Sequence, residues 1–226
     1  MWILVCLAVL AMSLLMLFRR KIYDISLPKI IIVFLFLVLF GVTSTYLMYY
    51  IENGEWEGTS LFGAVLFPPL LFVPISLIIR IRYTKLMDFI SPASLVMIGI
   101  MKANCILEGC CQGMPLWKTA GGEFVYFPSP LIESLATFAI IILLLRWENR
   151  KKHQNLFYPF VFILYGLIRF CLNWFRGIPK ITETILPMGN IWSLVAIIVG
   201  LVWLLVLRYM EINSRYNLLV KEKTQK

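Results

Sequence analysis

The sequence predicts an all-α membrane protein, a bundle of about seven transmembrane helices with its N-terminus outside and its C-terminus in the cytoplasm. Apolar residues make up 61% of the 226 residues and charged residues only 15%, whereas roughly a quarter of the residues in a soluble domain are charged. The surplus apolar surface requires lipid as its solvent. Runs of about 20 apolar residues, enough to cross the hydrocarbon core, recur along the chain. We therefore expect residues 1–226 to form a single transmembrane domain.

Apolar runs bounded by charged or turn-forming residues give the predicted helices. They span about residues 1–18, 28–51, 61–79, 86–105, 129–145, 156–175 and 191–209. The first run has no basic segment before it and no small-residue cleavage site, so we expect a retained helix and not a signal peptide. The third run contains Pro68, Pro69 and Pro74. Because proline removes backbone donors and kinks a helix, we expect this helix to lie buried among its neighbours.

The other helix ends are marked by the composition of the segments that follow them. The second helix ends at the acidic segment 52–57, and the fourth leads into the Gly- and Cys-rich loop 109–115. The fifth is followed by the basic segment 146–153, after which the sixth begins. The seventh precedes a polar tail that ends with residues 221–226.

The charges of the connecting segments orient the helices. Basic segments alternate strictly with acidic or nearly neutral ones, the basic set being 19–29, 80–85, 146–153 and 208–226. Lys and Arg collect in cytoplasmic loops, which places the N-terminus outside. The same rule accounts for the net charge of +9, so we expect the membrane as partner and no nucleic acid.

Two cations lie within predicted membrane segments, where a charge costs roughly 2.5–3.5 kcal/mol and so indicates a functional site. One is Lys102, near the outer end of the fourth helix, and the other is Arg169 in the sixth. Tyr165, Arg169 and Asn173 are spaced i, i+4, i+8 and share one helix face, which Arg176 joins one turn later. Arg176 also suits a side chain that extends to the outer interface.

Lys102 and Arg169 are expected at similar depth, and this favours a phosphate-binding site. The alternative is that each cation neutralises a carboxylate, Glu108 or Glu133. Glu133 begins the fifth helix, where a carboxylate favours the helix dipole, and it equally suits a role in the site. These alternatives stay open at this stage.

Three of the five cysteines cluster at Cys105, Cys110 and Cys111. Two of them are adjacent, the sequence contains no CxxC pair, and His153 is the only histidine and is expected on the cytoplasmic side. Zinc requires spaced ligands, so we expect no metal and no cofactor. A disulfide from Cys105 to one of the pair and buried, inert thiols are both compatible with the pattern.

Several segments, taken in order, resemble the bacterial prolipoprotein diacylglyceryl transferase family, especially its shorter relatives with a GCC-x-G segment. They are Phe62-Gly63-Ala64, Met87-Asp88-Phe89 with Ser91-Pro92-Ala93, Met101 to Gly113, Pro128 to Glu133, Tyr165 to Phe170 with Arg176, and Met188 to Ser193. The resemblance implies seven helices with the N-terminus outside. It also implies multi-pass insertion in the bacterial plasma membrane.

The resemblance further implies transfer of the diacylglyceryl group of phosphatidylglycerol to a cysteine thiol of a lipoprotein precursor peptide, at the outer face of the membrane. The implied catalytic residues are Lys102, Glu108, Glu133 and Arg169. The implied substrate-binding residues are Gly63, Asn104, Cys105, Gly109, Tyr165, Asn173 and Arg176. The alternatives are a relative with another acceptor or without activity, and a lipid-binding or transport protein that uses the same cationic pocket.

This sequence departs from the family's pattern at four places. Lys102 stands where the family has arginine, Asn104 where it has glycine, and Asn173 where it has a carboxylate. The family's third-helix histidine has no counterpart near Gly63. The acceptor thiol therefore has Glu108 or Glu133 as its predicted base.

Overall fold

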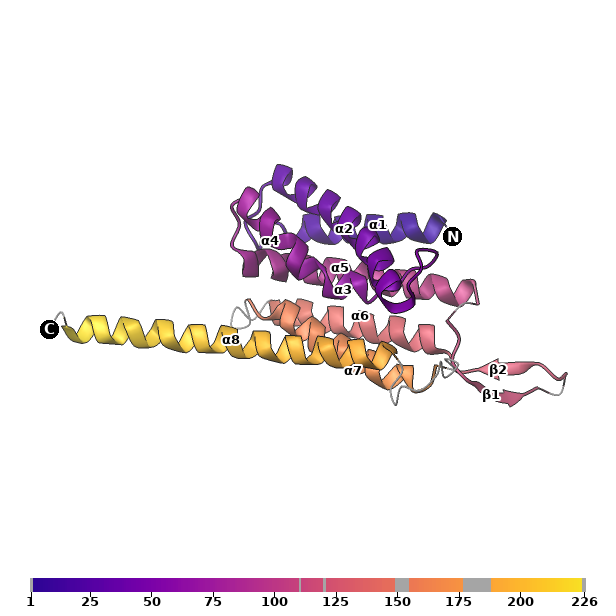
Figure 1. Ribbon diagram of the computed structural model, residues 1–226. Coiled ribbons are helices and arrows are strands. Elements are labelled where there is room, and N and C mark those ends of the chain that lie inside the picture. The colour runs from indigo at the N-terminus through magenta and orange to yellow at the C-terminus, as the bar shows by residue number, and fades with distance from the viewer. Residues whose placement is uncertain (1, 110, 120, 149–154, 177–187, 225–226) are drawn as a thin grey trace.

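The computed structural model describes residues 2–109, 111–119, 121–148, 155–176 and 188–224. Within them the chain is built of α-helices and one two-stranded hairpin (Figure 1). The elements are α1 Trp2–Arg19, α2 Leu27–Asn53, α3 Gly63–Leu66, α4 Pro68–Ile78, α5 Tyr83–Leu107, β1 Pro115–Lys118, β2 Phe124–Tyr126, α6 Ser129–Glu148, α7 Phe157–Asn173 and α8 Met188–Thr224. The predicted helical class is confirmed.

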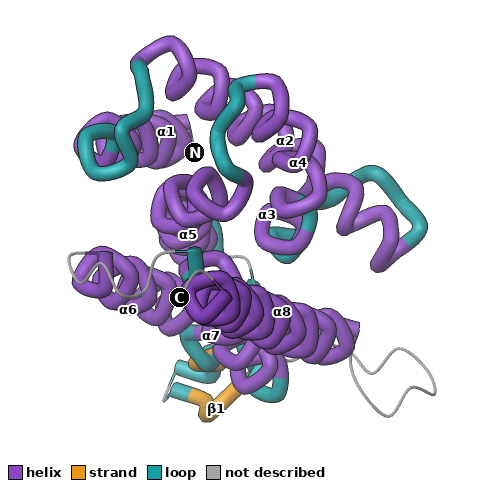
Figure 2. Tube along the Cα trace, turned by 90° about the vertical axis from the view of Figure 1, so that its left-hand side faces the viewer, coloured by secondary structure: helices purple, strands orange, loops and turns teal. Residues whose placement is uncertain are grey.

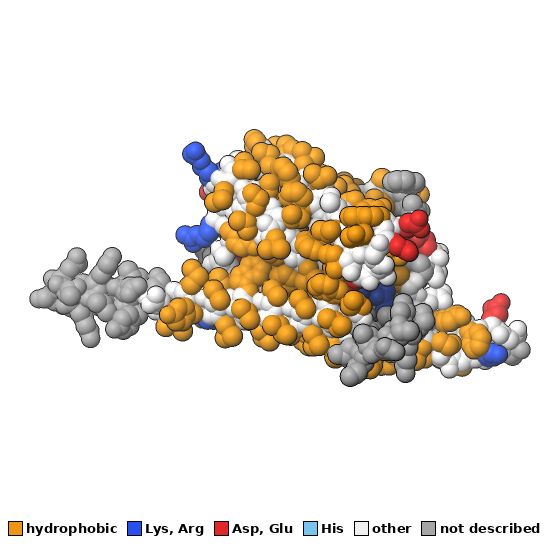
Figure 3. All heavy atoms as spheres, viewed as in Figure 1, with side chains coloured by type: hydrophobic (Ala, Val, Ile, Leu, Met, Phe, Trp, Pro, Cys, Tyr) orange, Lys and Arg blue, Asp and Glu red, His pale blue; other side chains and the backbone are white. Residues whose placement is uncertain are grey.

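Four of the described helices are long and apolar enough to cross a membrane. They are Leu27–Asn53, Tyr83–Leu107, Ser129–Glu148 and Met188–Asn213. Three shorter apolar helices accompany them, namely Ile3–Arg19, Gly63–Ile78 and Phe157–Asn173. The middle of the face in Figure 3 is largely apolar, while Lys and Arg side chains project from its left-hand end and both acidic and basic side chains lie towards its right-hand end. The protein is a membrane protein.

Helix α5 is the centre of the bundle. It packs against α1, α4, α6 and α7, and α8 packs against α7. Figure 2 shows α5 between one layer formed by α1, α2 and α4 and another formed by α6, α7 and α8. The largest fully buried side chains include Tyr158, Tyr165, Phe62, Phe72 and Phe89.

The predicted helix 61–79 is divided into α3 and α4. The break falls at Phe67, directly before Pro68 and Pro69, and Pro74 lies inside α4. Proline cannot donate the backbone hydrogen bond that would carry a helix through this point. Phe72, Ile75 and both prolines at the break are buried, as expected for a helix whose freed carbonyls must be shielded from lipid.

Two other predicted boundaries differ from the structure. The loop 109–128 contains the hairpin, in which Pro115 pairs with Tyr126 and Lys118 with Phe124. Helix α8 continues past the predicted end at residue 209 as far as Thr224. Its last turns are rich in Glu, Lys, Arg and Leu, which favour helix in water as well as in lipid. The segment 177–187 and residues 149–154 of the basic segment lie outside the described residues.

Candidate functional site

Glu133 is the centre of a buried group of charged and polar side chains. Its Oε1 accepts a hydrogen bond from the Tyr165 hydroxyl at 2.9 Å. Its Oε2 lies 3.0 Å from Nη1 of Arg169 and 3.1 Å from Nζ of Lys102. All four side chains are buried, and Glu133 is fully enclosed. We call these four residues the Glu133 cluster.

Three successive helices, α5, α6 and α7, bring the cluster together. Lys102 lies near the end of α5, Glu133 near the start of α6, and Tyr165 and Arg169 on the second half of α7. Tyr165 and Arg169 are four residues apart and therefore share one face of α7. Of the two carboxylates considered as partners for the cations, Glu133 is the one that both cations contact.

An aromatic ring covers Arg169. Its guanidinium carbon lies 4.9 Å from the centroid of the Phe62 ring, and Phe62 also packs edge-on against Tyr165 with 5.8 Å between ring centroids. The ring stabilises the cation in the absence of water. Gly63, the next residue, lets the start of α3 pack closely against α2, because a Cβ there would lie 1.9 Å from the backbone oxygen of Ser44.

The site carries an excess of positive charge. Lys102 and Arg169 share the single carboxylate of Glu133. Arg176 acts electrostatically on Glu133, and Glu52 acts on Arg169, so the wider surroundings add one charge of each sign. With these five side chains ionised, one positive charge is left without a counterpart. A buried charge without a partner is strongly unfavourable, and an anionic ligand would balance it.

Several buried polar atoms around the cluster have no hydrogen-bond partner within the described chain. They are Asn104 Oδ1, both amide atoms of Asn173 and of Asn190, Ser129 Oγ and Arg169 Nε. Ser129 precedes Glu133 by four residues and Asn173 follows Arg169 by four, so each shares a helix face with a member of the cluster. Buried polar groups in proteins are almost always paired. This concentration of unpaired atoms indicates a place for a polar ligand or for water.

Asn190 was missed as a site residue in the sequence. It follows Gly189 in the first turn of α8, and a Cβ on Gly189 would lie 2.8 Å from the Asn173 amide nitrogen. The start of α8 and the end of α7 are therefore closely packed. The available signal was a polar residue beside a glycine at the beginning of a long apolar run.

The remaining predicted site residues lie at the periphery. Glu108 is exposed at the end of α5 and makes no ion pair with a described residue, and Gly109 beside it has a positive φ of 65°. Cys105 and Arg176 are half-buried. Cys110 lies outside the described residues, so a disulfide through it stays a prediction. Among the described residues, no three His, Cys, Asp or Glu side chains are placed to hold a metal ion.

A second buried group lies at the other end of the helices and was also missed. Arg19, at the end of α1, pairs with Glu148 at the end of α6 and donates to the backbone oxygens of Asp88 and Phe89. It also donates to the Tyr23 hydroxyl at 3.1 Å. The sequence had assigned Arg19 to a basic loop, yet it is only 3% exposed.

Asp88 completes this second group and fixes the start of α7. Its carboxylate accepts hydrogen bonds from the backbone N–H groups of Asn155 and Phe157, the latter at 3.0 Å. A carboxylate at a helix start accepts hydrogen bonds from free backbone N–H groups and interacts favourably with the helix dipole. We call Arg19, Tyr23, Asp88 and Glu148 the Arg19 cluster.

Fold and site together define the class: a membrane protein of packed helices with a buried, net-positive polar site near one end of the bundle. The prolipoprotein diacylglyceryl transferase family matches residues 2–206. The chain belongs to this family, and the resemblance seen in the sequence is confirmed.

Two relatives show how distant the individual matches are. The phosphatidylglycerol–prolipoprotein diacylglyceryl transferase of Clostridium tetani (strain Massachusetts / E88) is 24% identical over 127 residues, which are 52% of this chain and 51% of the relative. The phosphatidylglycerol–prolipoprotein diacylglyceryl transferase 2 of Clostridium perfringens (strain 13 / Type A) is 23% identical over 155 residues, 64% of this chain and 60% of the relative. The matches thus span about half to three-fifths of these relatives.

Proposed function

We propose that this chain transfers the diacylglyceryl group of phosphatidylglycerol to the thiol of a cysteine in a lipoprotein precursor. The observation that carries the proposal is the unbalanced positive charge of the Glu133 cluster in a member of this family. Phosphatidylglycerol carries one negative charge on its phosphodiester, which would balance the site. Both relatives are named for phosphatidylglycerol and prolipoprotein.

We further propose that the chain crosses the bacterial plasma membrane seven times, with the Glu133 cluster towards the outer face. The four long spans and three shorter apolar helices would supply these crossings, α3 and α4 together forming one. The basic α1–α2 and α4–α5 connections would then face the cytoplasm. The lipid substrate would enter from the outer leaflet.

The reaction needs a stabilised leaving group. A bond forms between the acceptor sulfur and the terminal glycerol carbon of the diacylglyceryl group, and the bond from that carbon to the phosphate oxygen breaks. Glycerol phosphate leaves as the thiol loses its proton, and the released phosphate takes that proton up. Negative charge grows on the phosphate as the bond breaks, and Lys102 and Arg169 are the cations that would stabilise it.

The other residues of the site position these two cations and the lipid headgroup. Oε2 of Glu133 holds Lys102 and Arg169 side by side, and the Tyr165 hydroxyl donates to Oε1 of the same carboxylate. Because both carboxylate oxygens are engaged, we assign Glu133 a positioning role and not that of the base. The unpaired Oδ1 of Asn104 would accept from a glycerol hydroxyl, and the unpaired amide of Asn173 would donate to the phosphate and accept from a glycerol hydroxyl.

A transfer assay tests the proposal. The purified chain in detergent is incubated with phosphatidylglycerol, radiolabelled in its diacylglyceryl part, and with a peptide that contains the acceptor cysteine. We expect label on the peptide thiol, and we expect Arg169→Ala to lower the rate at least about a hundredfold. Arg208→Ala, which removes an exposed arginine of α8, is the matched control and should keep the rate.

The outcomes separate the alternatives. Release of glycerol phosphate without labelled peptide would identify another acceptor. Phosphatidylglycerol binding that depends on Arg169 without any turnover would identify a lipid-binding or transport protein. Full transfer by Arg169→Ala would refute the assigned site.

A further inference from the structure

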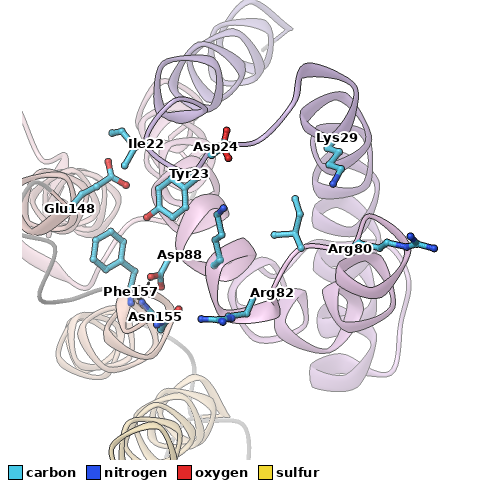
Figure 4. A pocket seen from close by; sticks show the side chains of 12 residues that line it. Ile22, Tyr23, Asp24, Lys29, Arg80, Arg82, Asp88, Glu148, Asn155 and Phe157 are labelled. Atoms are coloured by element: carbon cyan, nitrogen blue, oxygen red, sulfur yellow. Dashed lines mark hydrogen bonds between the residues drawn. The ribbon is translucent and has the colours of Figure 1, made fainter. Parts of the chain in front are cut away.

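A hollow of about 570 Å³ opens at the end of the bundle that carries the Arg19 cluster. It lies where the α1–α2 connection, the α4–α5 connection and the start of α7 meet (Figure 4). Four cations line it, namely Lys29, Arg80, Arg82 and Lys85. In Figure 4, Arg82 reaches towards Asp88 and Asn155, Lys29 comes from the opposite wall, and Arg80 points away.

The cations of the hollow are not neutralised by its acidic residues. In the part of the chain that the structure describes, none of the four cations makes an ion pair or a side-chain hydrogen bond. The acidic residues of the wall are occupied elsewhere or exposed. Asp88 accepts two backbone N–H groups, Glu148 is paired with Arg19, and Asp24 is exposed. The hollow therefore presents unpaired positive charge.

Two helix starts add to the positive electrostatic potential of the hollow. Helices α2 and α5 both begin at the hollow, at Lys29 and Lys85 within their first turns, and neither has a side-chain cap. An uncapped helix start offers free N–H groups and a partial positive charge, which favour an anion. Helix α7 begins at the same place, but Asp88 already satisfies it. The hollow thus offers free N–H groups from the start of α5 and, apart from Pro28, from that of α2, as well as ammonium and guanidinium groups.

The hollow is separate from the Glu133 cluster. Asp88 and Lys102 lie on the same helix, and the helical rise of 1.5 Å per residue places them roughly 20 Å apart along its axis. All the segments that form the hollow are helix ends and connections. In a membrane these lie at the level of lipid headgroups, on the side opposite the proposed reaction site.

We propose that this hollow is a second anion site, which takes the phosphate group of an anionic phospholipid from the leaflet opposite the reaction site. A phosphate fits the unpaired Lys29 and Lys85 ammonium groups and the two free helix starts. Basic pockets between helix ends at the cytoplasmic surface suit such headgroups. A soluble phosphate offers the same chemistry, and the experiment below distinguishes the two sources.

The experiment compares two double variants of the full chain that lose the same charge. Lys29→Gln/Lys85→Gln removes the charges of the two half-buried lysines that line the hollow. Arg20→Gln/Lys21→Gln removes two cations from the same end of the bundle that do not line the hollow. Binding of dioleoyl phosphatidic acid to each protein in neutral detergent is followed by native mass spectrometry, and inorganic phosphate is added as a competitor.

We expect the Lys29→Gln/Lys85→Gln protein to bind phosphatidic acid roughly thirtyfold more weakly at one site than the parent does. The control, Arg20→Gln/Lys21→Gln, should bind it as the parent does. The Glu133 cluster is intact in all three proteins, so the difference reports on the hollow alone. Competition by millimolar inorganic phosphate would identify soluble phosphate as the occupant, and its absence would identify the lipid. Equal weakening in both double variants, or in neither, would overturn the proposal.

Discussion

The Arg19 cluster and the Glu133 cluster are both buried and charged, but they differ in how completely their polar atoms are paired. Arg19 donates to a carboxylate, a hydroxyl and two backbone oxygens, and Asp88 accepts two N–H groups. Burial raises the pKa of the Tyr23 hydroxyl well above its ordinary value, so it stays protonated. Around Glu133, by contrast, amide, hydroxyl and guanidinium atoms are left unpaired.

We attribute the difference to a structural role of the Arg19 cluster and to the proposed functional role of the Glu133 cluster. The Arg19 cluster joins the ends of α1 and α6 to the starts of α5 and α7, and none of its buried side-chain polar atoms is left without a hydrogen-bond partner in the described chain. The Glu133 cluster has one more cation than its carboxylate can balance. A site that must receive an anion has to leave donors free, at a cost in stability. Burial of a charge alone therefore does not identify the active end of this bundle.

The largest expected effect on stability follows from removal of Arg19. Arg19→Ala leaves the buried Glu148 carboxylate and two backbone oxygens without their donor, which we expect to lower the free energy of unfolding by about 3–5 kcal/mol. The measurement is unfolding of the purified protein in mixed detergent. Transfer activity per folded molecule should stay unchanged, because Arg19 does not contact the Glu133 cluster. An unfolding free energy equal to that of the parent would show that the cluster is not structural.

Removal of Lys102 should have the opposite profile. Lys102→Ala leaves Arg169 and Glu133 as a balanced pair, so we expect little loss of stability and about a hundredfold loss of transfer rate. Lys102→Arg is the matched control and should keep the rate within about tenfold, since the charge remains. A large loss of stability with a normal rate per folded molecule would place Lys102 with the structural residues.

The smallest expected effect concerns the Tyr165 hydroxyl. Tyr165→Phe removes one donor to Glu133 while both cations remain, and we expect stability to fall by about 1.5 kcal/mol. The exposed Tyr209 supplies the control, as Tyr209→Phe. Because Tyr165 orients Glu133 and does not carry the charge, the apparent affinity for phosphatidylglycerol should change less than in Lys102→Ala. A larger change than in that variant would assign Tyr165 a direct contact with the lipid.

The sequence supplied the members of the Glu133 cluster but not their pairing. Alternating loop charges predict the direction of each helix, and the distance of Lys102, Glu133, Tyr165 and Arg169 from the helix ends predicts their depth. Which carboxylate the cations contact depends on helix rotation and packing. A single sequence without clear amphipathic faces does not define these.

The Arg19 cluster was hidden for a different reason. An arginine at the end of an apolar helix has the same pattern whether it faces the headgroups or turns inward to a distant carboxylate such as Glu148. The irregularity between α3 and α4 could be predicted from the sequence, because the effect of proline on a helix is local. The hairpin was not, because its short strands have mostly exposed side chains and no regular alternation of apolar residues.

The most direct test of the central claim is lipid preference at the Glu133 cluster. Affinities for phosphatidylglycerol and for zwitterionic phosphatidylcholine are measured on the Lys29→Gln/Lys85→Gln protein, so that the hollow at the other end does not contribute. Charge balance predicts a preference for phosphatidylglycerol of about tenfold or more, which Arg169→Ala abolishes and Arg19→Ala retains. Equal affinity for the two lipids, or a preference that survives Arg169→Ala, would contradict the assignment of this cluster as the anionic-lipid site.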